Sequence, residues 1–129
     1  MMDNRVPFQV LLVEDDVDIR EAIADLLEEF GYAVRTACNG REALDILATG
    51  YLPDLILLDL MMPVMDGWAL KAELAESKEL QAIPVVVLTA DVNVTGLAGS
   101  LPGSDYLRKP IAVDQLLRML DRMRSSGAA

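Results

Sequence analysis

Side chains able to do metal and phosphate chemistry directly follow the apolar runs of this chain. Glu14 and Asp15 follow the first run, Asp59 follows the third, and Thr89 and Lys109 follow two later ones. Ligands of parallel sheets bind beyond the carboxyl ends of the strands, so we expect these five side chains to meet at one edge. Three carboxylates there repel one another unless a cation neutralises them. Mg²⁺ suits such oxygen ligands, and the sequence therefore predicts a magnesium site beside a hydroxyl and an ammonium group.

Short apolar runs alternate with helix-like stretches, and this order predicts how the residues are positioned. Parallel strands joined by right-handed crossovers follow from it, and the predicted fold is a doubly wound five-stranded α/β sheet. Nearly continuous apolar runs indicate central strands, whereas Arg35 and Thr36 make the second run typical of an edge strand. The predicted strands cover residues 8–13, 33–38, 55–58, 85–88 and 106–107, and the predicted helices cover 19–30, 41–48, 66–80 and a segment from 113 onward.

Apolar spacing and capping residues define the predicted helices. Asp16 is a candidate N-cap of the first helix, and Gly31 is a candidate C-cap. The residues expected to face the core are Ile19, Ile23, Leu26, Leu27 and Phe30 in the first helix and Val113, Leu116, Leu117 and Leu120 in the last. Between the last two strands, glycine and proline oppose a regular helix, so we expect residues 92–104 to form a short or irregular fourth helix.

Composition excludes several classes of function. The chain has 129 residues, no histidine, one cysteine and a formal net charge of −10. Without an imidazole, Ser-His-Asp and Cys-His catalysis cannot be completed, and a negative surface argues against direct binding of nucleic acid. No apolar run approaches the length of a membrane span, and a lone cysteine fits a reducing, cytoplasmic compartment. We expect one domain over 1–129, with a core at about 8–124 and loose ends at 1–7 and 125–129.

Four motifs in order resemble the receiver domains of two-component response regulators over about residues 8–124. They are LLVEDD at 11–16, DLMMPVMDG at 59–67, VLTA at 87–90 and DYLRKP at 105–110. The resemblance implies a flavodoxin-like fold with strand order 2-1-3-4-5, as in the chemotaxis member of the family. It also implies a phospho-acceptor that assists its own phosphorylation and dephosphorylation, rather than an enzyme.

The resemblance assigns a role to each candidate site residue. Asp59 would accept a phosphoryl group from a partner's phosphohistidine. Mg²⁺ would be held by Glu14, Asp15, the Asp59 carboxylate and the backbone carbonyl of Met61. Thr89 and Lys109 would contact the phosphoryl oxygens, Tyr106 would be the switch aromatic, and the bond between Lys109 and Pro110 would be cis.

The resemblance also implies partners. The phosphoryl donor would be a sensor histidine kinase or a histidine phosphotransfer protein, since this chain has no histidine of its own. The output partner is unknown, dimerisation stays open, and the chain is either a stand-alone receiver or a piece of a longer regulator. Two alternatives are a phosphate-independent interaction module with the same fold and a small flavin-binding protein. The acidic first loop disfavours the flavin protein, because it would repel a phosphate in the absence of a metal ion.

Overall fold

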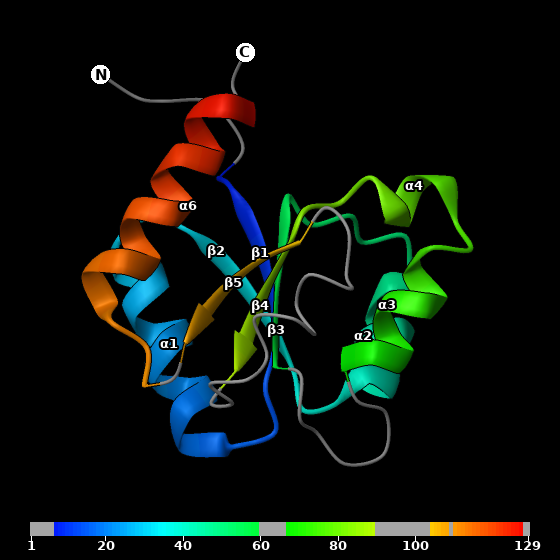
Figure 1. Ribbon diagram of the computed structural model, residues 1–129, viewed down its shortest axis with the longest axis horizontal. Coiled ribbons are helices and arrows are strands. Elements are labelled where there is room, and N and C mark those ends of the chain that lie inside the picture. Colours follow the sequence, from blue (N-terminus) through cyan, green and yellow to red (C-terminus); the bar gives the residue numbers. More distant parts are fainter. Residues whose placement is uncertain (1–6, 60–66, 90–103, 109, 128–129) are drawn as a thin grey trace.

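A computed structural model describes residues 7–59, 67–89, 104–108 and 110–127, and its centre is a parallel β-sheet (Figure 1). Four strands lie in the order β2-β1-β3-β4, and β5 pairs with β4 at the far edge. The parallel α/β sheet and the edge position of the second strand confirm the sequence prediction. The strands are β1 (Gln9–Val13), β2 (Ala33–Ala37), β3 (Leu55–Asp59), β4 (Val85–Thr89) and β5 (Ser104–Arg108).

Helices cover both faces of the sheet. Helices α1 (Val17–Glu29) and α6 (Val113–Gly127) lie on one face, and α2 (Gly40–Leu47) and α3 (Gly67–Leu74) lie on the other (Figure 1). A short helix, α4 (Lys78–Gln81), follows α3. None of the helices in the described part of the chain is long and apolar enough to cross a membrane.

Each face of the sheet has its own hydrophobic cluster, because alternate strand residues point to opposite sides. Leu11 and Leu58 belong to the cluster under α2 and α3, whereas Leu12 and Leu57 belong to the cluster under α1 and α6. These four side chains have no solvent-exposed surface. Burial on both faces explains why β1 and β3 are almost wholly apolar in sequence.

Capping residues fix where the first two helices begin and end. The side chain of Asp16 accepts a hydrogen bond from the Ile19 N–H at 3.1 Å, which confirms Asp16 as the N-cap of α1. Asn39 caps α2 in the same way through the Glu42 N–H at 2.8 Å. Beyond α1, Gly31 has φ of +91°, a left-handed conformation that residues with a Cβ adopt at a cost.

The structure differs from the predicted helices in three places. The helix predicted over 66–80 is two helices, because the chain turns at 75–77 and Ser77 caps α4 by accepting from the Leu80 N–H. Phe30 and Val113 were expected in the core but are 54% and 49% exposed, since each lies at a helix end beyond the packed face. Helix α6 continues to Gly127, past the point where a loose end was expected. The predicted irregular segment, 92–104, lies outside the described residues except for Ser104.

Candidate functional site

The ends of two neighbouring strands bring acidic residues together. Val13 pairs with Leu58 across β1 and β3, so the next residues along these strands, Glu14 and Asp59, lie at the same level. Asp15 follows Glu14 in the turn that leads into α1. Because both strands run parallel in the middle of the sheet, the sheet itself sets the spacing of these residues.

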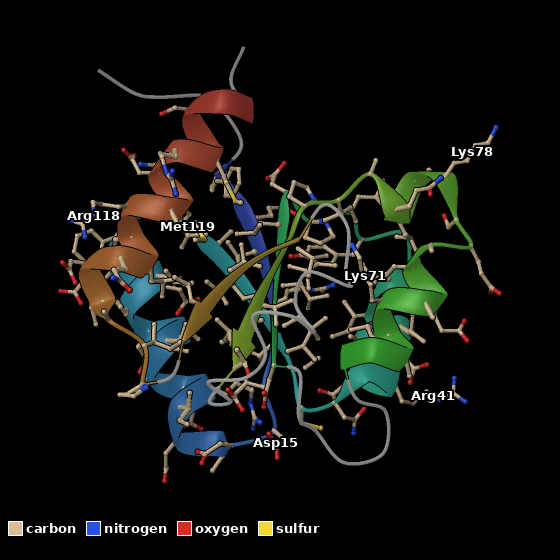
Figure 2. The ribbon with its side chains drawn as sticks, viewed as in Figure 1. Asp15, Arg41, Lys71, Lys78, Arg118 and Met119 are labelled. Atoms are coloured by element: carbon tan, nitrogen blue, oxygen red, sulfur yellow. The ribbon has the colours of Figure 1, made fainter. Side chains whose placement is uncertain are left out.

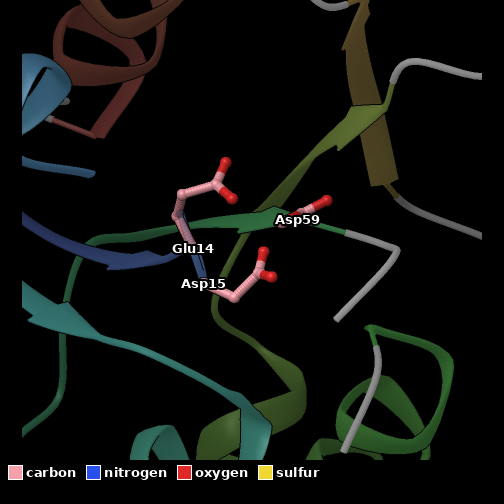
Figure 3. Close-up of side chains that lie close together, drawn as sticks. All are labelled: Glu14, Asp15 and Asp59. Atoms are coloured by element: carbon pink, nitrogen blue, oxygen red, sulfur yellow. The ribbon is translucent and has the colours of Figure 1, made fainter. Parts of the chain in front are cut away.

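The carboxylates of Glu14, Asp15 and Asp59 form one cluster, as predicted from the sequence (Figure 3). Each residue offers an oxygen atom, and the three atoms lie within 4.8 Å of one another. Glu14 is fully buried and Asp59 is 3% exposed, whereas Asp15 is open to solvent. Two of the three acidic residues are therefore buried, and an incoming group can approach the cluster from the side of Asp15.

Hydrogen bonds that involve backbone groups hold the turn that carries Glu14 and Asp15. The Glu14 N–H donates to the Ala37 carbonyl at 3.0 Å, which ties the turn to β2. The Asp16 N–H donates to Oε2 of Glu14 at 3.3 Å. Nη1 of Arg20 donates to the Glu14 carbonyl at 2.9 Å. Arg20 was not among the residues predicted from the sequence, because the order of residue types does not indicate where its side chain points.

The structure places one further predicted residue at this edge of the sheet. Thr89 is the last residue of β4 and is 2% exposed, one position beyond the pair formed by Asp59 and Leu88. Met61, Lys109, the side chain of Tyr106 and the peptide bond between Lys109 and Pro110 lie outside the described residues. Their predicted roles stay predictions.

Carboxylate oxygens in this number and spacing fit a hard divalent cation. Mg²⁺ takes one or two carboxylates and fills its other positions with water or phosphate oxygens, and one side of this cluster is solvent-exposed. A cation also removes the repulsion among the three carboxylates. The donor set therefore fits Mg²⁺, with Glu14, Asp15 and Asp59 as the side chains that would hold it.

Comparison with known proteins shows to which protein family this chain belongs. The model of the "Response regulator receiver domain" matches residues 10–121. The chain belongs to this family. A receiver domain is a phospho-acceptor signalling module rather than a classical enzyme, and the acidic pocket is consistent with a magnesium-dependent phospho-acceptor site.

Curated relatives of this receiver domain are longer proteins. The response regulator MprA of Mycolicibacterium vanbaalenii is 38% identical over 122 residues, which are 93% of this chain and 50% of that protein. The probable transcriptional regulator ycf27 of Cyanidium caldarium is 41% identical over 117 residues, 88% of this chain and 45% of that protein. The receiver domain thus spans about half the length of the curated relatives it matches.

Solved structures agree with the fold. The chemotaxis protein CheY4 of Vibrio cholerae is 30% identical, with a TM-score of 0.82 over 92% of this chain and 99% of that one. The receiver domain of the sensor histidine kinase PA1611 from Pseudomonas aeruginosa is 29% identical, with a TM-score of 0.82 over 92% and 98% of the two chains. That structure has a magnesium ion coordinated in its active-site cleft.

Proposed function

We propose that this receiver domain is switched by phosphorylation of Asp59, with Mg²⁺ held by Glu14, Asp15, Asp59 and the Met61 carbonyl. The observation that carries the proposal is the cluster of three carboxylates within 4.8 Å at the ends of β1 and β3. The magnesium ion in the similar PA1611 receiver supports the choice of metal.

In the proposed reaction, an Asp59 carboxylate oxygen attacks the phosphorus of a phosphohistidine on a histidine kinase or phosphotransfer protein. A P–O bond forms as the P–N bond breaks, and the electron pair of the broken bond leaves with the imidazole. Transfer of this kind needs positioning and charge neutralisation more than covalent chemistry from the protein. When bound, Mg²⁺ would neutralise charge between the incoming phosphoryl group and the carboxylates.

The remaining residues of the proposed site act on the phosphoryl oxygens. The Thr89 hydroxyl would donate a hydrogen bond to one oxygen, and the Lys109 ammonium would offset the charge of the others. A cis bond between Lys109 and Pro110 would aim that ammonium toward the site. Tyr106 would turn inward as Thr89 is drawn to the phosphoryl group, and this rearrangement would alter the surface offered to an output partner.

We extend the proposal to the whole chain. Residues 1–129 would form one flavodoxin-like, doubly wound domain with a short or irregular fourth helix over 92–104, acting in the cytoplasm. The family match over 10–121 supports a single receiver domain. The acidic character of the chain supports protein partners over direct contact with nucleic acid.

The test is phosphorylation by acetyl phosphate, a small phosphodonor, in the presence of Mg²⁺. Intact-mass spectrometry should detect one added phosphoryl group that hydroxylamine removes, as expected for an acyl phosphate. Asp59→Asn should abolish the addition, and EDTA should prevent it in the unsubstituted chain.

The exposed Asp25 of α1 supplies the control, since Asp25→Asn removes the same charge away from the cluster. Undiminished labelling of Asp59→Asn would reject Asp59 as the acceptor. No labelling of the unsubstituted chain would favour the phosphate-independent module.

A further inference from the structure

Arg20 reaches back from α1 to the turn that carries two of the three clustered carboxylates. Its half-buried side chain places Nη1 2.9 Å from the Glu14 carbonyl oxygen and 3.5 Å from the Asp15 carbonyl oxygen. One nitrogen atom thus bridges consecutive carbonyls of the acidic turn. Arg20 is also anchored at its own backbone, where its N–H donates to the Asp16 carbonyl at 2.9 Å.

Fixing these two carbonyls fixes where the neighbouring carboxylates point. The orientation of each peptide plane sets the backbone dihedral angles on either side, and these angles direct the Cα–Cβ bonds of Glu14 and Asp15. Asp15 is solvent-exposed, so core packing does not restrain its side chain as it does that of Glu14. A hydrogen bond from a charged donor is a strong restraint on such a turn.

We propose that Arg20 is a positioning residue that holds Glu14 and Asp15 in the geometry that binds a divalent cation, without touching the cation itself. The inference rests on the proposed function, because it concerns the same metal site. Groups that orient metal ligands from outside the coordination shell commonly change metal affinity by about 10–100-fold when they are removed.

The positive charge of Arg20 has an effect of opposite sign, and this makes the inference testable. A guanidinium beside the cluster repels an incoming cation, so removal of the charge alone would tighten Mg²⁺ binding. Removal of the hydrogen bonds releases the turn and would weaken binding. Positioning dominates, because Nη1 contacts the carbonyls of the ligand residues directly.

The experiment is isothermal titration calorimetry of MgCl₂ into the full chain and three variants. Arg20→Gln removes both charge and reach, and its dissociation constant should rise about tenfold. Arg20→Lys keeps the charge on a flexible stem without the rigid fork, and its constant should rise by a smaller factor. Arg118→Gln is the matched control, because Arg118 lies on α6 (Figure 2) and forms an exposed ion pair with Asp114 at 3.3 Å. Its removal should leave Mg²⁺ affinity unchanged.

A second measurement separates positioning from a merely structural role. The rate of phosphorylation by acetyl phosphate, followed against Mg²⁺ concentration, should show a higher half-saturating concentration for Arg20→Gln and an unchanged plateau. Urea unfolding in EDTA identifies any loss of fold, and Arg20→Lys carries the comparison if Arg20→Gln is not cooperatively folded.

Each outcome has a distinct meaning. Equal or tighter Mg²⁺ binding by Arg20→Gln overturns the inference, because the charge effect then outweighs positioning. A lower plateau at unchanged half-saturation also overturns it, since Arg20 would then act on the transfer step. Absence of Mg²⁺ binding by the unsubstituted chain would instead refute the proposed metal site, and this inference with it.

Discussion

Removing one charge from the acidic cluster should stabilise the metal-free protein. Asp15 is the residue to change, because its carboxylate belongs to the cluster while its side chain is open to solvent. Asp15→Asn keeps the shape of the side chain and removes its charge. The substitution therefore reports on repulsion from Glu14 and Asp59 with little effect on packing.

The distance within the cluster sets the size of the effect. Two unit charges at the 4.8 Å limit repel by about 0.9 kcal/mol at the dielectric constant of water and by about 3.5 kcal/mol at an effective value of 20. Because Asp15 is exposed, the lower value applies to each of its two pairs. We expect the free energy of unfolding in EDTA to rise by about 1–2 kcal/mol, or roughly 4 °C in Tm per kcal/mol for a domain of this size.

Saturating Mg²⁺ should make the unsubstituted chain more stable to unfolding than Asp15→Asn, the reverse of the order in EDTA. A ligand that binds only the folded state adds about 2.7 kcal/mol at a concentration one hundred times its dissociation constant. The unsubstituted chain should gain this stabilisation, whereas Asp15→Asn has lost a carboxylate ligand and should gain much less. The variant is then the more stable protein in EDTA and the less stable one in saturating Mg²⁺.

Urea unfolding followed by far-UV circular dichroism measures the free energy of unfolding of both proteins in EDTA and in saturating Mg²⁺. Equal m-values make these free energies comparable. Asp25→Asn on α1 is the control, and its unfolding free energy should change by less than about 0.5 kcal/mol with the Mg²⁺ response intact. A destabilised Asp15→Asn in EDTA would refute repulsion as the dominant interaction of this side chain. A full Mg²⁺ response in the variant would remove Asp15 from the ligand set.

Three further predictions concern the scaffold. Gly31→Ala should lower the free energy of unfolding in urea by about 1–2 kcal/mol, because a Cβ meets no neighbour there and only the strain of φ +91° opposes it; unchanged stability would contradict this. Arg124→Ala should cost about 0.5–1 kcal/mol in the same assay, since the guanidinium lies 4.7 Å from the centroid of the Tyr32 ring, and a neutral effect would show that this contact contributes nothing. Burial raises the pKa of Tyr51, with Arg35 lowering it less, so the folded state retains the phenol proton longer. The contribution of this pKa shift to the free energy of unfolding is present below pH 10 and is lost as pH rises through the folded pKa of Tyr51. Tyr51→Phe should therefore flatten the alkaline fall in stability above pH 10, and an unchanged pH profile would argue against the shift.

Sequence reasoning located the sheet because the signals there are strong. Continuous apolar runs predict buried parallel strands, and the polar residues of β2 correctly predict its place at the edge. The acidic cluster could be predicted in the same way, because the carboxyl ends of parallel strands lie at the same edge of the sheet. Glu14, Asp15 and Asp59 needed only the order of the strands to be brought together.

Helix ends were harder to predict because spacing alone does not say where packing stops. Phe30 continues the apolar stripe of α1, but the helix ends at Glu29 and leaves Phe30 54% exposed. Ser77 was a usable sign of a new helix start, yet the surrounding good helix formers favoured one continuous helix. The contact of Arg20 with the acidic turn depends on a side-chain direction that no pattern of residue types specifies.

The sheet separates two hydrophobic clusters that draw on alternate residues of the same strands. Substitutions at Leu12 and Leu58 therefore change different packing environments, because their side chains point to opposite faces and belong to different clusters. Energetic effects usually add for residues that lie more than about 7–10 Å apart and share no packing partners, so additivity is expected first for the side chains that helices on opposite faces contribute to the two clusters, such as Leu27 and Leu47. For protein engineering, the layer under α1 and α6 and the layer under α2 and α3 can be diversified in separate libraries and recombined afterwards, with the strand backbone as the shared boundary.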